Sequence, residues 1–137
     1  MGIVKKAGNG LSRDFSEIEQ LQTSIKGHKE FTKAAIERTL KILRNELQKS
    51  RPQYAVVAAG DKIPNANHFL VSPLDGEINF MHGIPYFAIS VAEVVNGNVV
   101  TAVTYNPATS DMYFAEKGNG AFKEAQSCFY HTHPRCR

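Results

Sequence analysis

The last ten residues of the chain contain four side chains that are good zinc ligands. Cys128, His131, His133 and Cys136 follow one another at short intervals, and thiolate and neutral imidazole groups can complete a tetrahedral zinc site. Structural zinc sites, however, usually separate their two ligand pairs by a longer loop. His131 and His133 also stand too close together for a relaxed tetrahedral arrangement. We therefore interpret this spacing as a coincidence in an unstructured tail.

A second group of candidate residues lies in the middle of the chain, where an apolar run leads into a glycine flanked by carboxylates. Residues 69–85 read Phe-Leu-Val-Ser-Pro-Leu-Asp-Gly-Glu-Ile-Asn-Phe-Met-His-Gly-Ile-Pro. This segment resembles the inositol monophosphatase family, whose pattern there is an aromatic residue, two apolar residues and Asp-Pro-x-Asp-Gly-Thr-x-Asn-Phe-x-His-Gly-x-Pro. The resemblance continues through Val94-Val95-Asn96-Gly97 and Tyr105-Asn106-Pro107 to Lys117-Gly118-Asn119-Gly120-Ala121-Phe122.

Weaker similarity extends back over residues 30–36, Glu-Phe-Thr-Lys-Ala-Ala-Ile, where the family has Asp-x-Val-Thr-x-x-Asp. The resemblance implies a layered αβαβα fold and magnesium-dependent hydrolysis of a small phosphate monoester, typically an inositol phosphate. That chemistry needs several converging carboxylates, because magnesium prefers oxygen ligands in near-octahedral geometry. The metal ions would activate a water, neutralise the phosphate and stabilise the leaving alkoxide.

Most positions that the resemblance assigns to metal ligands carry other residues in this chain. The family's second-helix aspartate corresponds to Ile36, the first glutamate of its Gly-Glu-Glu motif to Ala59, and the first aspartate of Asp-Pro-x-Asp to Ser72. Asp75 keeps its carboxylate, and Leu74 could still offer a backbone carbonyl. One carboxylate is too few to hold a cluster of divalent cations. We therefore expect magnesium to bind weakly or not at all.

The phosphate-binding turn of the family is also altered. In the family, Asp-Gly-Thr opens a helix whose backbone N–H groups face the phosphate. Gly76 is kept, but Glu77 replaces the threonine, and its carboxylate would repel a phosphate. Asp75 could be a residual metal ligand or the N-cap of the short helix that follows, and we favour the cap. Lys26 lies near the family's site-facing lysine, and we interpret it as a solvated loop residue.

Two helices and a set of strands must position these residues. Apolar side chains at helical spacing predict one helix between Leu11 and Ile25, interrupted afterwards by Lys26-Gly27-His28. A second apolar stripe between Ile36 and Leu47 predicts another helix. That helix ends at Arg51-Pro52, because proline disfavours helical geometry in the residue before it.

Beyond Pro52 the apolar pattern becomes strand-like. Strands are predicted in the runs 54–59, 69–71, 86–95, 99–105 and 112–115. Asn96-Gly97-Asn98 is a hairpin signal between two of them. The predicted fold class is α+β, a partial layered αβαβα sandwich of the inositol monophosphatase/sugar phosphatase type, with two N-terminal helices packed on a mainly antiparallel sheet. We assign residues 1–122 to this region and expect residues 123–137 to be an unrelated, disordered tail, since the composition changes there.

Composition excludes several other classes of protein. The chain has 137 residues and a net charge of +3 without a dense Lys/Arg block, so one domain fits and nucleic-acid binding is disfavoured. No apolar run is long enough to cross a bilayer, and the N-terminus lacks a secretion signal. Both cysteines lie in the last ten residues, so no disulfide framework is predicted and the cytoplasm is the expected compartment.

Three hypotheses for function follow from these observations. The first is a degenerate, inactive inositol monophosphatase-like protein that lacks the family's C-terminal half and self-associates, as a homodimer or otherwise, through the apolar surface left exposed. The second is a non-catalytic regulatory or protein-binding module that uses the hairpin and Gly118-Asn119-Gly120 as its interface. The third is an active phosphatase whose metal site has been rebuilt from Asp61, Asp75 and Glu77.

Overall fold

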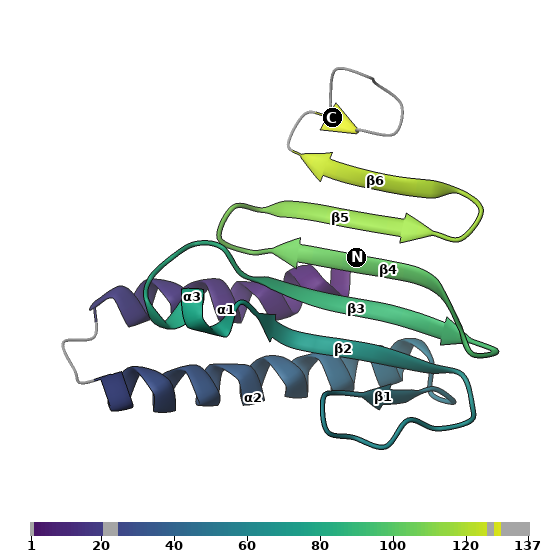
Figure 1. Ribbon diagram of the computed structural model, residues 1–137, viewed down its shortest axis with the longest axis horizontal. Helices are drawn as coiled ribbons and strands as arrows, with labels where there is room; N and C mark the ends of the chain where they lie inside the picture. The colour runs from purple at the N-terminus through teal and green to yellow at the C-terminus, as the bar shows by residue number, and fades with distance from the viewer. Residues whose placement is uncertain (1, 21–24, 126–127, 130–137) are drawn as a thin grey trace.

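The computed structural model describes the backbone of residues 2–20, 25–125 and 128–129, and the side chains of residues 2–18 and 27–124 (Figure 1). Its elements follow in chain order: α1 (Gly2–Gln20), α2 (Ile25–Ser50), β1 (Ala55–Val57), β2 (His68–Asp75), α3 (Glu77–Met81), β3 (Ala88–Val95), β4 (Asn98–Asn106), β5 (Asp111–Glu116), β6 (Gly120–Ala125) and β7 (Cys128–Phe129). None of the described helices is long and apolar enough to cross a membrane.

The strands form one sheet in which spatial order equals chain order, from β1 to β7. β1 pairs with β2 in parallel, and every later pair is antiparallel. The tight connection from β3 to β4 is the predicted hairpin, with Asn96 at φ 52° and Gly97 at φ 79°. Positive φ at both central residues is what a type I′ turn requires, and Asn-Gly supplies it at little cost. The predicted architecture of two helices on a mainly antiparallel sheet is confirmed.

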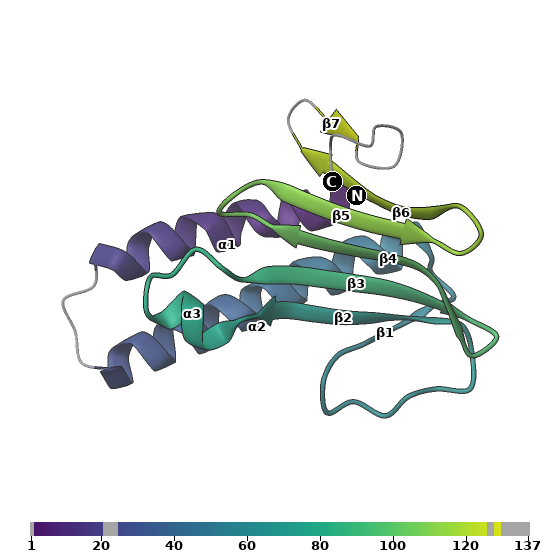
Figure 2. The ribbon, with the colours of Figure 1, turned by 45° about the horizontal axis from the view of Figure 1, so that its top comes forward.

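The two long helices lie side by side on one face of the sheet, as the two views agree (Figures 1 and 2). Along each strand, successive side chains point alternately toward the helices and toward the other face of the sheet. Val71, Ile89 and Tyr105 are buried beneath the helices, whereas Ser72 pairs with Ser90, and Ser90 with Thr104, on the other face. Neither long helix reaches that second face, which we call the open face of the sheet.

An aromatic cluster packs the helix layer against the end of the sheet at which Asp75 and Gly76 lie. Phe15 of α1 lies 5.7 Å from Phe80 of α3 and 4.9 Å from Phe87, and Phe80 lies 5.1 Å from Phe87, between ring centroids. Phe80 is fully buried and Phe87 nearly so. Tilted and edge-on aromatic pairs at these distances add to the stabilisation that burial alone provides. The cluster therefore fixes the short helix that begins immediately after the motif's glycine.

Two ion pairs join the two long helices to each other. Asp14 of α1 is buried and lies 2.8 Å from the guanidinium of Arg38 on α2. Near the start of α1, Lys6 Nζ donates a hydrogen bond of 2.7 Å to Glu46 of α2. That hydrogen bond lowers the pKa of Glu46 below its usual value. Glu46 therefore favours the native state at neutral pH, and its contribution fades as the pH falls through this lowered pKa.

Helix boundaries differ from the sequence-based prediction at the first turn of α2. Lys26-Gly27-His28 lie inside α2, which begins at Ile25, so the predicted interruption there is wrong. A single glycine costs a helix only about 1 kcal/mol relative to alanine. The packing of a helix as long as α2 outweighs that cost. The side chain of Lys26 lies outside the described part of the chain.

One strand is longer than predicted, and another was not predicted. β2 runs from His68 to Asp75 rather than over residues 69–71, and β6 covers Gly120–Ala125, where the sequence analysis predicts no strand. Within β6, Lys123 pairs with Tyr113 and also forms a salt bridge of 3.5 Å with Asp111. This pairing carries regular structure across the expected boundary at residue 122. A separate tail over residues 123–137 remains a prediction.

Removing the central aromatic ring tests the role of the aromatic cluster. We expect Phe80→Ala to lower the free energy of unfolding by about 3–5 kcal/mol, because a fully buried ring leaves a cavity. Ile78→Ala, on the same short helix but with Ile78 69% exposed, is the matched control and should change stability by less than about 0.5 kcal/mol. Urea denaturation followed by circular dichroism measures both. Equal effects of the two substitutions would contradict the assigned role.

Candidate functional site

The turn between β2 and α3 depends on Gly76. Its backbone is left-handed, with φ 87° and ψ 38°, and it is the N-cap residue of α3 without any side-chain cap hydrogen bond. A Cβ atom at this position would lie 2.9 Å from the carbonyl oxygen of Tyr86. The prediction that Asp75 caps the helix is therefore wrong, since Asp75 is the last residue of β2 and stands one position too early. The left-handed conformation and the tight packing both require glycine here.

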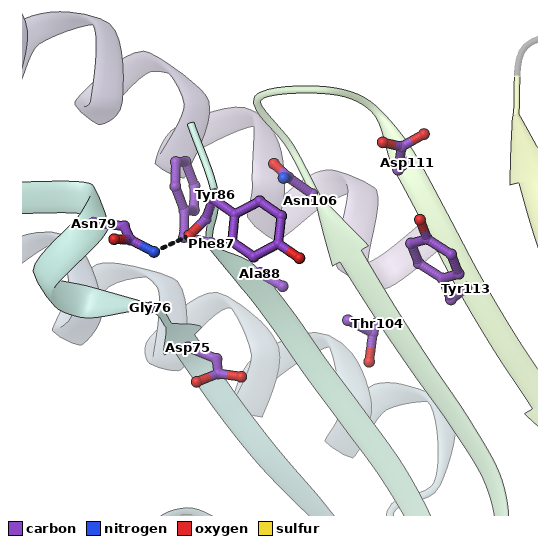
Figure 3. Close-up of a pocket in the computed structure, with 10 residues that line it drawn as sticks. All are labelled: Asp75, Gly76, Asn79, Tyr86, Phe87, Ala88, Thr104, Asn106, Asp111 and Tyr113. Atoms are coloured by element: carbon purple, nitrogen blue, oxygen red, sulfur yellow. Dashed lines mark hydrogen bonds between the residues drawn. The ribbon is translucent and has the colours of Figure 1, made fainter. Parts of the chain in front are cut away.

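Beside this turn lies a surface pocket of about 400 Å³, which we call the Asp75 pocket. It opens between the end of β2, the segment before β3, and strands β4 and β5 (Figure 3). Its lining consists of Asp75, Gly76, Asn79, Tyr86, Phe87, Ala88, Thr104, Asn106, Asp111 and Tyr113. The Tyr86 ring projects over the pocket between Asn106 and Ala88, with Asp75 and Tyr113 on either side (Figure 3).

Two asparagines fix the backbone that carries Tyr86. Asn79 Nδ2 donates a hydrogen bond of 2.8 Å to the carbonyl oxygen of Tyr86. Asn106 Nδ2 donates one of 3.2 Å to the carbonyl oxygen of Pro85. The side-chain oxygen of Asn106 also accepts a bond from the N–H of Ala108. The side-chain amide groups nearest the pocket are thus engaged in holding its wall.

The two carboxylates of the Asp75 pocket differ in their surroundings. Asp111 accepts a hydrogen bond of 2.8 Å from the hydroxyl of Thr109 and lies 3.5 Å from Lys123 Nζ. Asp75 is exposed, and the residues that the structure describes give its carboxylate no hydrogen-bond or salt-bridge partner. The charge of Asp111 is therefore compensated locally, whereas that of Asp75 is not.

A second hollow of about 430 Å³ lies on the open face, and we call it the Ser72 pocket. Ala59 and Ser72 both line it, so the fold brings together two of the positions that the family resemblance assigns to metal ligands. Asp61 lines it too, but its carboxylate pairs with Arg44 at 2.8 Å and accepts a bond from the N–H of Ala58. Thr104 lines both pockets, so the two hollows adjoin.

The residues present do not fit a magnesium centre. Ile36 is half-buried and packs against the core, and Ala59 and Ser72 offer no carboxylate. Asp61 and Asp75 line different pockets. In residues 2–18 and 27–124, no group of three or more His, Cys, Asp or Glu side chains could hold a metal ion. The rebuilt cluster of Asp61, Asp75 and Glu77 is therefore not assembled.

The remaining predicted site residues are spread apart. Leu74 is buried in the core, and Gly76 lines the Asp75 pocket. Glu77 is exposed at the start of α3 and does not line either pocket. Of the four tail residues considered for zinc, Cys128 lies on β7 with its side chain outside the described part, and the other three lie outside it altogether.

Sequence reasoning missed four residues of the Asp75 pocket, namely Tyr86, Thr104, Asp111 and Tyr113. None belongs to a motif of the resemblance. Thr104 and Tyr113 meet there because they are cross-strand partners in the register of β4 and β5. The alternation of side chains along each strand could have placed both residues on the same face of the sheet. Only the pairing register between β4 and β5 shows that they are neighbours.

The fold and the site together define a class of layered α+β protein whose motif glycine follows the second strand of a mainly antiparallel sheet. The chain belongs to the inositol monophosphatase family, whose model matches residues 1–134. It is 47% identical over 123 residues to an inositol-1-monophosphatase of Rhizobium meliloti, covering 87% of this chain and 46% of the relative. It is 31% identical over 121 residues to the Nus factor SuhB of Vibrio cholerae, covering 85% and 45%.

Solved structures show the same fold. The crystal structure of the extragenic suppressor protein SuhB from Bartonella henselae matches with a TM-score of 0.78 and 34% identity, over 93% of this chain and 50% of that one. The chain thus spans about half the length of the curated relatives that it matches. The family's reaction depends on magnesium, so the residues at the positions that the resemblance assigns to metal ligands matter for any activity of this chain.

A pair of glycine substitutions separates close packing from backbone strain at the motif turn. Gly97→Ala changes a positive-φ residue with open space around it and should cost about 1–2 kcal/mol of unfolding free energy. Gly76→Ala carries the same backbone strain and adds a contact of 2.9 Å with Tyr86, so it should cost clearly more. Chemical denaturation of both variants measures the free energy of unfolding that each substitution removes. An equal loss in both would show that the approach of Tyr86 imposes no constraint.

Proposed function

We propose that this chain is a degenerate inositol monophosphatase-like protein that does not hydrolyse phosphate monoesters on its own. The observation that carries the proposal is the composition of the ligand positions. Ile36, Ala59 and Ser72 replace three carboxylates, and the remaining Asp75 lies in a different pocket from Ala59 and Ser72. A cation that prefers several oxygen ligands finds too few of them here.

The charge around the motif turn supports the same proposal. Glu77 stands exposed where the resemblance expects threonine, and Asp75 is exposed two residues before it. A phosphate ester approaching this turn would meet two carboxylates without the metal ions that neutralise them in metal-dependent hydrolysis. Substrate binding would thus be disfavoured before any chemical step could occur.

A second candidate function is a protein-binding or regulatory module, and three exposed side chains near the motif turn favour it. Ile78 is 69% exposed, Ile84 47% and Tyr86 77%, and all three lie on or just after α3. Large exposed apolar side chains can take part in protein interfaces. Relatives named Nus factor SuhB are the second support for this candidate. Self-association and a cytoplasmic location stay predictions for this chain.

A phosphate-release assay tests the leading proposal. We expect the purified chain to release no phosphate from inositol monophosphate above the level without protein, with or without magnesium, because the metal-ligand set is incomplete. Asp75→Asn is the matched variant and should be indistinguishable from the unchanged chain. Magnesium-dependent turnover that Asp75→Asn abolishes would contradict the proposal and favour a rebuilt metal site.

A further inference from the structure

We propose that the Asp75 pocket binds a small organic cation, of the amine or quaternary ammonium class. This inference goes beyond the loss of phosphatase chemistry and does not depend on it. Its basis is the lining of this pocket, which contains an uncompensated carboxylate and two tyrosine rings but no basic side chain (Figure 3).

The charges of the lining favour a positively charged ligand. The lining includes the carboxylates of Asp75 and Asp111 but no lysine, arginine or histidine. Lys123 compensates Asp111 from outside the lining, while no described residue forms a salt bridge with Asp75. A carboxylate within contact distance of an ammonium group attracts it even in a partly solvated site.

Several side-chain polar groups of the lining already make hydrogen bonds within the fold. The amide of Asn79 donates to the carbonyl of Tyr86, and the amide of Asn106 donates to that of Pro85. The hydroxyl of Thr104 lies 3.1 Å from that of Ser90, so these two groups share one hydrogen bond. A phosphate or carboxylate entering the pocket would meet the two tyrosine hydroxyls but no cationic donor, and the carboxylate of Asp75 would repel it.

The tyrosine rings supply the apolar, electron-rich surface that such a cation needs. Lys123 Nζ lies 5.2 Å from the ring centroid of Tyr113, so this ring already contacts one ammonium group of the protein, which stands outside the lining. Tyr86 is 77% exposed, and its ring lies between Asp75 and Tyr113 (Figure 3). Tyrosine faces attract ammonium groups within about 6 Å, and quaternary ammonium ions are typical ligands of aromatic walls.

The same features separate an organic cation from a metal ion. A divalent ion needs about six oxygen ligands, whereas Asp75 is the one uncompensated carboxylate of this pocket. A quaternary ammonium ion carries its charge over methyl groups, so ring faces and a single carboxylate can replace its solvent contacts. Since the pocket is open and Asp75 is exposed, the dissociation constant should be on the order of millimolar.

Three probes of equal shape and different charge test the proposal on the whole chain. Choline is the cation, 3,3-dimethyl-1-butanol its neutral isostere and 3,3-dimethylbutanoate the anion, each titrated by ¹H–¹⁵N correlation NMR. We expect choline alone to shift the amide signals around the Asp75 pocket with saturation. Equal binding of choline and the neutral alcohol would overturn the proposal in favour of a merely apolar hollow, and tighter binding of the anion would overturn it outright.

Variants localise the binding. Asp75→Asn and Tyr86→Leu should each weaken choline by about threefold or more, since each removes one attraction to the charge. Ile78→Ala, exposed on α3 but outside the lining, is the control and should leave the affinity unchanged. If Asp75→Asn and Tyr86→Leu both bind choline as the unchanged chain does, the pocket is not the site. Because no turnover is measured, this result is independent of the phosphate-release assay.

Discussion

The contact between α3 and α1 is the constraint on which the rest of the site depends. Phe80 places its ring against Phe15 and Phe87, and it can do so only if the chain turns sharply at Gly76. The turn requires a left-handed backbone at Gly76, which is packed against the carbonyl of Tyr86. One buried ring and one glycine thereby set the end of β2, the start of β3 and the place of Tyr86. The Asp75 pocket beside them is therefore formed by these packing contacts, independently of its function.

This separation of scaffold from chemistry explains how a family fold persists without the family's ligand set. Ile36 packs against the core, and Ala59 and Ser72 line a hollow that needs no carboxylate to form. The apolar burial that stabilises the helices on the sheet involves the opposite face from Ala59 and Ser72. Replacing a ligand on the open face therefore removes a cation site at little cost in stability. The turn itself carries the exposed carboxylates of Asp75 and Glu77.

Much of the fold could be predicted from local patterns. The stripe from Leu11 to Ile18 and that from Leu43 to Leu47 are buried as their helical spacing indicates, and Asn96-Gly97 forms the expected hairpin. The pocket could not be predicted in the same way. Thr104 and Tyr113 are neighbours through strand register, and Asp75 was misassigned because a preferred capping residue preceded a glycine that performs the capping turn itself. Local propensity fixes elements, whereas contacts between strands decide which side chains share a site.

Isothermal titration of the chain with magnesium measures whether the replaced carboxylates remove the family's metal chemistry. We expect no saturable heat of binding, and no difference between the unchanged chain and Asp75→Asn. Specific, saturable magnesium binding that Asp75→Asn abolishes would contradict this expectation, because a metal centre would then have been rebuilt around Asp75.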